Sequence, residues 1–525
     1  FPELAITGYP PEDLLLRESF IGKNFAVLEE IAAFSSNTSG IIGFVDRKTD
    51  SNNQDNNERT IANAAAIVQN GDVRGIYHKS FLPNYSVFDE ARYFSKGTNS
   101  DTLFWYDDIA IGINICEDIW IEDGPAEDQV KQGASLIINI NASPYDIQKN
   151  ETRKELVMKK ALKLNVPIIY LNMVGGQDEL VFDGGSFVVN DLGEIIYQAS
   201  SFQEEVFHLD IDLKIKKQNS KSSLTTRPKT TKLKDVKSKP SLSENESIYS
   251  ALKLGLLDYV SKNKFTKVLI GISGGIDSAL TAAICVDALG SENVLGVAMP
   301  SKYNSKESLE DAMTLSDNLG INLKIIEIEK IVDSFREVLG NSLKEGLGQI
   351  TDENIQSRVR GNILMGLSNQ TGAMVVSTGN KSEMAVGYST LYGDLAGGFA
   401  LIKDLYKTKV YELSNYRNSI SDAIPENIIS KEPSAELRPN QFDSDSLPDY
   451  EVLDKILNLY IEEDSSSERI IASGVQPGLV YDVLEKVDRN EYKRKQVAPG
   501  VKLTQKAFGK DRRMPITNTY IRQKE

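Results

Sequence analysis

The chain has 525 residues, of which 40% are hydrophobic and 26% charged, and its formal net charge at pH 7 is -16. This composition is that of a globular protein of about two to four domains, and its acidic balance disfavours proteins that coat nucleic acid or membranes, which need a basic field. No apolar run approaches the roughly 18 residues of a membrane span, and the opening FPELAITGYPPEDLLLRESF lacks the apolar stretch of a signal peptide. We therefore expect a cytoplasmic protein with neither nucleic acid nor a membrane as partner.

Cysteine and histidine are scarce. The two cysteines, Cys116 and Cys285, exclude a disulfide framework and fit a reducing cytosol. The two histidines, His78 and His208, are too few for a His-rich metal site and argue against Ser-His-Asp catalysis.

The first part of the chain, residues 1–213, predicts a layered α/β domain. Short apolar runs at 109–115, 135–140 and 167–173 are typical of buried strands, and 149–165 has the periodicity of a helix. The segment 184–200 predicts a β-hairpin that turns at Asp191-Leu192-Gly193.

Residues 214–243 separate this domain from the next. The segment holds ten Lys or Arg, ten Ser or Thr and one acid, Asp235, with almost no large apolar side chain. Such a composition buries too little surface to offset its ordering entropy, which predicts a linker. A basic patch for an acidic partner is the alternative interpretation.

Residues 244–525 predict a second domain, which starts with alternating strands and helices. KVLIGISGGIDSALTAAICVDALG (267–290) is the pattern of a strand, a Gly-rich turn and a helix, and further strands are predicted at 293–300 and 323–328. The alternation predicts a doubly wound parallel sheet. From about residue 440 we expect a less regular tail.

The Gly-rich turn is the segment Ser273-Gly274-Gly275-Ile276-Asp277-Ser278. Adjacent glycines let backbone N–H groups approach an anion, and the helix N-terminus adds a positive dipole. No lysine follows the glycines, so this is not a Walker A loop, and Asp277 suits a phosphate site only if it holds Mg²⁺. An ordinary turn would not need the SGGxDS pattern, so we predict a phosphate-binding loop.

This loop resembles the pyrophosphate-binding loop of the ATP pyrophosphatases (adenine nucleotide alpha hydrolase-like proteins), which split ATP into AMP and pyrophosphate. Further motifs resemble one family of that class, the glutamine-dependent NAD+ synthetases, and the resemblance covers essentially the whole chain. Those motifs are Ser377-Thr378-Gly379-Asn380-Lys381-Ser382-Glu383, Gly387-Tyr388-Ser389-Thr390-Leu391-Tyr392-Gly393-Asp394, Lys431-Glu432-Pro433-Ser434-Ala435-Glu436-Leu437 and Tyr492-Lys493-Arg494.

The resemblance implies roles for residues of the second domain. ATP would contact Gly271, Ile272, Ser273, Gly274, Gly275, Ile276, Asp277, Ser278, Thr378 and Lys407. Mg²⁺ would be held by Asp277 and Glu383, and deamido-NAD+ would contact Asn354, Glu383, Asp394 and Lys493.

The residues themselves support these roles in part. In the helical segment 353–367, Ile355, Val359 and Ile363 recur every four residues and predict a buried face. Asn354 and Arg358 share a more polar face that reaches either a ligand or solvent. A surface acid at Glu383 and an exposed lysine at Lys493 are the corresponding alternatives.

Cys116 follows the predicted strand 109–115, at the end of a strand where ligands of α/β domains usually bind. An inert buried cysteine is the alternative, and it is our prediction for Cys285. Three segments favour a reactive Cys116: Phe1-Pro2-Glu3-Leu4, Tyr77-His78-Lys79 and Ile115-Cys116-Glu117-Asp118. Together they resemble the Glu-Lys-Cys centre of the nitrilase superfamily, an α-β-β-α sandwich that forms the amidase domain of glutamine-dependent NAD+ synthetases.

The resemblance implies Glu3, Lys79 and Cys116 as catalytic residues. A thiol with a pKa of about 8.5 needs a base or a cation nearby to attack an amide at neutral pH. Glu3 would accept its proton, and Lys79 would stabilise the oxyanion. Glu90 matches the supporting carboxylate, and the positions that hold glutamine are matched by Tyr85, Ser143 and Lys149. His78 points away from Lys79 in an extended segment, so we interpret it as structural.

On this hypothesis the first domain hydrolyses glutamine, and the second adenylates deamido-NAD+ with ATP so that ammonia displaces AMP and yields NAD+. The family also implies a homo-oligomer and an internal ammonia tunnel. Family members normally have a strand and a helix before the FPEL segment, so we expect these to be missing and Glu3 to lie at a poorly ordered chain end. Another glutamine-dependent amidating ligase of the ATP-pyrophosphatase class and a non-catalytic nucleotide-binding regulator remain alternatives.

Overall fold

The computed structural model describes residues 1–36, 38–48, 61–98, 102–213, 238–343 and 347–518, in two compact units. One unit comprises Phe1–Gln177 and Phe182–Leu242, and the other comprises Asp178–Val181 and Ser243–Glu525. Residues 214–237 of the predicted linker lie outside the described residues. In the remainder of that segment, the Lys239 N–H donates to the carbonyl oxygen of Gln198 (2.9 Å), which ties this stretch to the first unit. No helix among the described residues combines the length and hydrophobicity that a membrane span needs.

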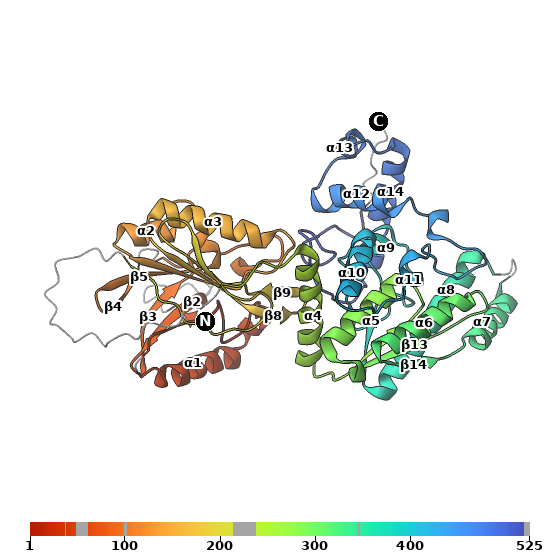
Figure 1. Cartoon of the computed structure of the whole chain (residues 1–525), viewed down its shortest axis with the longest axis horizontal. Coiled ribbons are helices and arrows are strands. Elements are labelled where there is room, and N and C mark those ends of the chain that lie inside the picture. The colour runs from red at the N-terminus through yellow and green to blue at the C-terminus, as the bar shows by residue number, and fades with distance from the viewer. Residues whose placement is uncertain (37, 49–60, 99–101, 214–237, 344–346, 519–525) are drawn as a thin grey trace. The chain divides into compact units, whose positions relative to one another are not determined.

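The first unit contains two sheets that lie face to face (Figure 1). The antiparallel sheet β1-β2-β3 consists of Gly40–Arg47, Ile61–Gln69 and Asp72–His78. The other sheet has the order β11-β10-β7-β6-β5-β4, in which β5, β6 and β7 are parallel. Its strands are β4 Leu103–Tyr106, β5 Ile109–Ile115, β6 Leu136–Asn141, β7 Ile168–Asn172, β10 Phe187–Val189 and β11 Ile195–Gln198. A separate pair consists of β8 (Val174–Gln177) and β9 (Leu180–Asp183).

Helices cover the outer faces of both sheets. Helix α1 (Glu18–Ala33) covers the sheet β1-β2-β3, and α2 (Pro125–Lys131) and α3 (Lys149–Leu164) cover the other sheet. In β2, Ala64 and Ala66 pack with α1, whereas Ala65 and Ile67 pack between the sheets, because side chains alternate along a strand. These layers confirm the predicted α-β-β-α sandwich, and the predicted strands, helix and hairpin turn are also confirmed.

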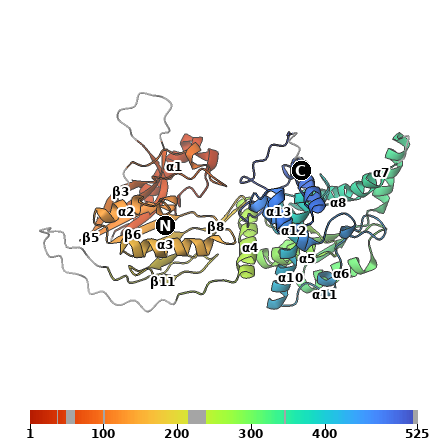
Figure 2. The ribbon, with the colours of Figure 1, turned by 90° about the horizontal axis from the view of Figure 1, so that it is seen from above.

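The second unit contains a parallel sheet in the order β14-β13-β12-β15-β16. Its strands are β12 Val268–Gly271, β13 Val294–Ala298, β14 Asn322–Ile325, β15 Met374–Ser377 and β16 Phe399–Ala400. Its larger helices are α4 Glu244–Lys262, α5 Ile276–Leu289, α6 Lys306–Leu319, α7 Glu329–Ser342, α8 Gln349–Thr371 and α10 Lys407–Ile420, followed by the short α11 Glu426–Ser430. Helices α4, α5 and α10 pack together (Figure 2), whereas α7 and α8 pack against the face of the sheet that carries Leu269, Val297 and Val375.

This sheet confirms the predicted doubly wound fold. The strand order reverses between β12 and β15, which both lie beside the Gly-rich loop that follows β12. In open parallel sheets, ligands bind at the carboxyl ends of the strands where the order reverses. The fold therefore places the predicted phosphate-binding loop at the expected ligand edge.

The prediction of a less regular tail after residue 440 is wrong for residues 450–494 and holds for 495–518, where the structure has no helix or strand. The chain there forms α12 (Tyr450–Leu457), α13 (Ser467–Ala472), α14 (Pro477–Arg489) and α15 (Glu491–Arg494). Val480, Val483, Leu484 and Val487 of α14 are fully buried in a core that they share with Leu453 of α12. Their i, i+3, i+4, i+7 spacing is a helical signal, and the shortness of the neighbouring helices hides it in the sequence.

Candidate active sites

Cys116 follows β5 directly and begins the short 3₁₀ helix η3 (Cys116–Ile119). Its side chain is 4% exposed, and its φ of 46° lies in the left-handed region, where a residue with a side chain is strained. Strain of this kind persists only where the surrounding structure enforces it, and it clusters at functional sites. Cys285, by contrast, is a fully buried residue inside α5, and burial raises the pKa of its thiol.

Three charged side chains that are far apart in the sequence meet near Cys116. Lys79 Nζ donates to Glu3 Oε1 and to Glu90 Oε1, each at 2.7 Å, and all three residues are buried. Glu3 Oε2 also accepts the backbone N–H of Ala142 at 2.9 Å. These contacts fix Glu3, contrary to the expectation of a poorly ordered chain end.

Burial and charge shift the pKa values of this cluster. Burial opposes the charge on Lys79, but Glu3 and Glu90 outweigh it and raise the pKa of Lys79 well above its usual value. Burial raises the pKa of Glu90 to about 7. The charge of Lys79 opposes this shift, and the charge of Glu3 adds to it. Burial and the charge of Glu3 also raise the pKa of the Cys116 thiol. The thiol is therefore protonated at neutral pH and needs a base close by to remove its proton.

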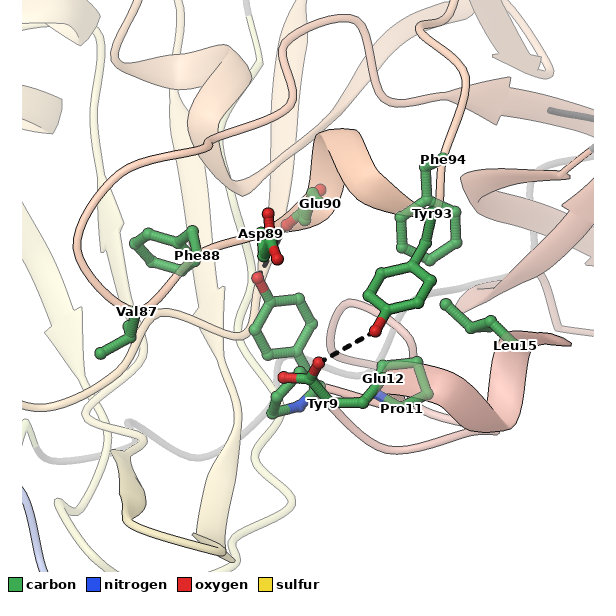
Figure 3. Close-up of a pocket in the computed structure, with 11 residues that line it drawn as sticks. Tyr9, Pro11, Glu12, Leu15, Val87, Phe88, Asp89, Glu90, Tyr93 and Phe94 are labelled. Carbon is green, nitrogen blue, oxygen red and sulfur yellow. Dashed lines mark hydrogen bonds between the residues drawn. The ribbon is translucent and has the colours of Figure 1, made fainter. Parts of the chain in front are cut away.

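Two residues that the sequence did not single out complete the cluster. Asn63 of β2 donates from Nδ2 to Glu3 Oε1 (2.7 Å), and the Tyr9 hydroxyl donates to Glu90 Oε1 (2.8 Å). Figure 3 shows Tyr9 and Glu90 at a pocket of about 20 Å³ that Phe88 also lines, which is room for about one water molecule. A signal for Asn63 was present, since it is the polar residue within the apolar run IANAAAIV (61–68).

Two of the residues predicted to hold glutamine contact Phe88. The rings of Tyr85 and Phe88 meet edge to face with their centroids 5.5 Å apart, and Lys149 Nζ lies 5.4 Å from the Phe88 ring centroid. Tyr85 is 55% exposed, and its hydroxyl donates to Glu117 at 2.9 Å. Phe88 thus brings together Tyr85 and Lys149, which are 64 residues apart in the sequence.

Ser143 is buried next to Ala142, the residue whose N–H binds Glu3. Arg153 fixes Ser143 by donating from Nε to Ser143 Oγ (3.2 Å) and from Nη2 to the Ser143 carbonyl oxygen (2.7 Å). Arg153 is itself buried and pairs with both carboxylate oxygens of Asp183 (2.7 and 2.9 Å). Nothing in the sequence marks this pair, because Arg153 is one of several charged residues on a helix.

His78 contacts a residue outside the cluster. Its Nε2 lies 2.7 Å from Asp46 Oδ2. This contact agrees with the interpretation of His78 as structural, since the neighbouring Lys79 points to Glu3 and Glu90.

In the second unit, glycines and serines shape the loop between β12 and α5. Gly274 has a φ of 81°, and a Cβ atom there would lie 2.2 Å from the Ser308 carbonyl oxygen, so this position requires glycine. The Ser273 N–H donates to Ser278 Oγ, and the Gly275 N–H donates to Ser273 Oγ, each at 3.2 Å. Gly275 is the N-cap of α5, so the loop lies at the positive end of a helix of 14 residues. Such a loop favours a bound phosphate.

Asp277, in the first turn of α5, is surrounded by other predicted site residues. Asn380 Nδ2 donates to Asp277 Oδ1 at 2.9 Å, and Lys407 Nζ pairs with Asp277 Oδ2. Lys407 Nζ also lies 3.4 Å from Glu383 Oε1. Asn380 is the N-cap of α9 (Lys381–Val386) and accepts the Glu383 N–H at 2.9 Å. The structure thus groups Asp277, Glu383 and Lys407, and it adds Asn380, which the sequence left without a role.

The carboxylates around Lys407 exceed its positive charge. Burial and the charge of Asp277 raise the pKa of Glu383 to about 8, and Asp443 acts in the same direction. Within the described ranges, no three His, Cys, Asp or Glu side chains are arranged as a metal site made of protein alone. Magnesium at ATP sites usually binds one or two carboxylates together with phosphates, and an ion of this kind at Asp277 and Glu383 would offset the repulsion that raises the pKa of Glu383.

Three of the four residues predicted to contact deamido-NAD+ bind Thr390 or the residues just before it, whereas Glu383 lies with Asp277 and Lys407. The Oγ1 of Thr390 donates to Asn354 Oδ1, and the Thr390 backbone N–H donates to Asp394 Oδ1, each at 2.7 Å. Lys493, on α15, is partly buried and donates to the carbonyl oxygens of Gly387 and Ser389 (2.8 and 2.9 Å). Burial lowers the pKa of Lys493, and the charge of Asp394 opposes this shift.

Helix α8 and the end of β15 contribute the remaining predicted residues. Ile355 and Val359 are buried as predicted, and Arg358 is exposed, with its Nε donating to the Leu391 carbonyl oxygen at 3.2 Å. Thr378 directly follows β15, at the edge of the sheet where the Gly-rich loop also lies. A cavity of about 310 Å³ is lined in part by Leu391, Tyr392, Leu395 and Gln496.

Comparisons with known proteins match the two units to two families. Residues 1–216 match the family model of carbon-nitrogen hydrolases, and residues 248–497 match that of NAD synthases. The chain is 47% identical over 545 residues to a glutamine-dependent NAD(+) synthetase of Thermotoga maritima, which covers 99% of this chain and 92% of the relative. This chain belongs to the glutamine-dependent NAD+ synthetases.

Further relatives of this family agree. A glutamine-dependent NAD(+) synthetase of Aquifex aeolicus is 46% identical over 538 residues, covering 99% of this chain and 93% of the relative. The solved structure of a glutamine-dependent NAD+ synthetase from Acinetobacter baumannii, in complex with adenosine diphosphate, is 42% identical with a TM-score of 0.73. It covers 98% of this chain and 91% of that protein. The cluster around Cys116 falls in the carbon-nitrogen hydrolase range, and the loop at 271–278 falls in the NAD synthase range.

Proposed function

We propose that this chain makes NAD+ from deamido-NAD+ and ATP, with ammonia that it releases from glutamine. One observation carries the proposal: a single chain holds both a buried Glu3-Lys79-Cys116 cluster and a Gly-rich loop next to Asp277 and Lys407. We assign glutamine hydrolysis to residues 1–213 and NAD+ synthesis to residues 244–525, joined by the linker 214–243. Family membership favours this activity over another amidating ligase or a nucleotide-binding regulator, because relatives over nearly the whole chain carry this name.

Glutamine hydrolysis starts at Cys116. Glu3 removes the thiol proton, and Sγ attacks the carbon of the side-chain amide of glutamine. Lys79, which two carboxylates keep charged, stabilises the oxyanion that develops. The C–N bond then breaks, the nitrogen takes up the proton and leaves as ammonia, and a γ-glutamyl thioester remains on Cys116.

Water completes the reaction. Glu3 activates the water molecule that attacks the thioester, and glutamate leaves as the Cys116 thiol regains its proton. Glu90 supports the charge of Lys79, and its own raised pKa shows how crowded the two carboxylates are. We assign the holding of the substrate to Tyr85, Lys149 and Ser143. Tyr85 is exposed, Lys149 lies over the Phe88 ring, and Ser143 is buried and follows Ala142, whose N–H binds Glu3.

Synthesis takes place at the loop of the second unit. Gly271–Ser278 binds the phosphates of ATP through backbone N–H groups, with Thr378 and Lys407 as further contacts. A carboxylate oxygen of the nicotinate ring attacks the α-phosphorus, pyrophosphate leaves, and ammonia then attacks the acyl carbon and displaces AMP. Asp277 and Glu383 would hold Mg²⁺, which supplies positive charge to the departing pyrophosphate when bound. Lys407 adds a cation at the same place.

The acceptor substrate contacts Asn354, Glu383, Asp394 and Lys493. Asn354 and Asp394 both bind Thr390, and Lys493 binds the carbonyl oxygens of Gly387 and Ser389 nearby in the sequence. We further propose that the protein works in the cytoplasm as a homo-oligomer, and sedimentation of the purified chain tests the second point. The motivation for the cytoplasm is the absence of a membrane-crossing helix among the described residues together with two unpaired, buried cysteines.

Cys116→Ala tests the division of labour. The variant lacks a nucleophile, so glutamine-driven NAD+ synthesis should fall by several orders of magnitude. Synthesis from ammonium should stay near the parent rate, because the second unit has its own sheet and core. Cys285→Ala is the matched control, since it removes the other buried thiol and should keep both activities. A Cys116→Ala enzyme that still uses glutamine efficiently would show that the nucleophile lies elsewhere.

A further inference from the structure

Asp118 is a buried carboxylate that none of the steps above uses. It is 0% exposed and lies in η3, two residues after Cys116. The carboxylate accepts hydrogen bonds on both oxygens. Ser80 and Phe81 donate their backbone N–H groups to Oδ1 (3.1 and 2.9 Å), whereas the Ile115 N–H and the Tyr77 hydroxyl donate to Oδ2 (3.1 and 2.8 Å).

The donors of Asp118 lie next to two proposed catalytic residues. Ser80 directly follows Lys79, and Ile115 directly precedes Cys116. One carboxylate group therefore binds the backbone beside the lysine through one oxygen and the backbone beside the cysteine through the other. The two segments come from different sheets, since β3 ends at His78 and β5 ends at Ile115. Sequence-local contacts alone would not fix the distance between them.

The strained backbone of Cys116 gives this contact a specific task. A φ of 46° is unfavourable for cysteine, so the turn has to be held by its surroundings. The bond from Ile115 to Asp118 spans that residue, because it links the last residue of β5 to the third residue of η3. Bonds to an ionised acceptor are stronger than those between neutral groups, which makes a carboxylate effective in this role.

We propose that Asp118 is a positioning residue of the glutaminase centre. Through its two carboxylate oxygens it holds the Cys116 turn and the Lys79 segment at a fixed position relative to each other. This inference rests on the proposed function of Cys116 and Lys79. Asp118 does not act on glutamine itself; it fixes the geometry in which the thiol attacks the amide carbon and the ammonium group faces the oxygen of the same amide.

Asp118→Asn separates positioning from packing. The amide has nearly the size of the carboxylate, but it accepts through one oxygen only. When that oxygen faces Ser80 and Phe81, the NH₂ group meets the Ile115 N–H, and two donors face each other. In the reverse orientation the NH₂ group meets the Ser80 and Phe81 N–H groups. Either way one half of the connection is lost, while the volume of the site is kept.

The full-length Asp118→Asn protein should show a selective defect. The kcat for glutamine hydrolysis should fall about 100-fold, because displacements of about 1 Å at a reacting group cost that much. The KM for glutamine should stay within about threefold, since the donors to Asp118 described above belong to Tyr77, Ser80, Phe81 and Ile115, which are not among the proposed glutamine-binding residues. NAD+ synthesis from ammonium, measured on the same preparation, should match the parent. Tyr77→Phe is the control: it removes one donor to Asp118 and leaves the backbone bonds intact, so its kcat should stay within about threefold.

Three results would overturn the inference. The first is an Asp118→Asn kcat close to that of the parent, and the second is an equal loss in Tyr77→Phe, which would indicate packing around the carboxylate. The third is a parallel loss of ammonium-driven synthesis, which would indicate a general folding defect. A parent that makes NAD+ from ammonium but does not hydrolyse glutamine would instead refute the proposed glutaminase function itself.

Discussion

Gly274→Ala tests whether the shape of the loop, rather than its charge, makes the synthetase site. The substitution adds a single methyl group at a φ of 81°, which costs about 1–2 kcal/mol for alanine. The new Cβ atom would lie 2.2 Å from the Ser308 carbonyl oxygen, with the Ser308 Cα and carbonyl carbon at 2.9 Å. These are backbone atoms at the start of α6, so they cannot rotate out of the way, and the loop has to move by roughly 1 Å. Misplacement by that distance lowers a rate about 100-fold.

The assay is NAD+ synthesis from ammonium at varied ATP concentration. We expect kcat/KM for ATP to fall about 100-fold, while glutamine hydrolysis stays at the parent level because its residues lie in the other unit. Gly366→Ala is the matched control: this glycine lies within α8, a Cβ atom there would have nothing within 4 Å, and alanine should stabilise the helix by about 0.5–1 kcal/mol. A Gly274→Ala enzyme within threefold of the parent would refute the argument that close approach of the loop to α6 sets the ATP site.

Three further substitutions test single residues. Asp277→Asn should abolish NAD+ synthesis with either glutamine or ammonium, because it removes a proposed Mg²⁺ ligand and the partner of Lys407, and synthesis at the parent rate would contradict that role. Lys493→Ala should raise the KM for deamido-NAD+ much more than that for ATP, and an unchanged KM for deamido-NAD+ would favour a purely structural lysine. Glu90→Gln should flatten the pH dependence of stability. Because the pKa of Glu90 is raised from 4.5 to about 7, its contribution to stability is fully present below pH 4.5 and lost as the pH rises through 7. The Tm of the parent should therefore fall relative to the variant between pH 5 and 8, and parallel Tm curves would contradict the shifted pKa.

The sequence predicts the layers of both units well, because strand and helix periodicities are local. The runs at 109–115 and 268–271 are so apolar that they predict buried strands. The glycines between β12 and α5 predict a loop with an unusual backbone, and Gly274 indeed has a positive φ and no room for a Cβ atom. The same local signal exists for α14, at Val480, Val483, Leu484 and Val487, but the short helices on either side of it obscure the pattern.

What the sequence does not contain is the set of polar contacts between distant segments. Asn63 and Tyr9 lie 60 and 81 residues from the carboxylates that they bind, and Asp118 binds a backbone segment 37 and 38 residues earlier in the chain. No periodicity links such partners, because they are brought together by the tertiary packing of segments that lie far apart in the sequence. An isolated buried polar residue in an apolar run, such as Asn63, indicates that a partner exists without indicating which one.

The four residues Asp178–Val181 belong to the second unit although they lie far from it in the sequence. Glu179 pairs there with Lys403, which is 3% exposed, and its carbonyl oxygen accepts the Lys502 N–H at 2.8 Å. A fragment that begins at residue 243 would therefore keep a buried ammonium group and lose its carboxylate, at a cost on the order of 3 kcal/mol. No single cut in the linker yields an intact second half. A loss of activity in a truncated chain would therefore reflect the damage done by the cut. The two activities have to be separated by point substitutions in the whole chain.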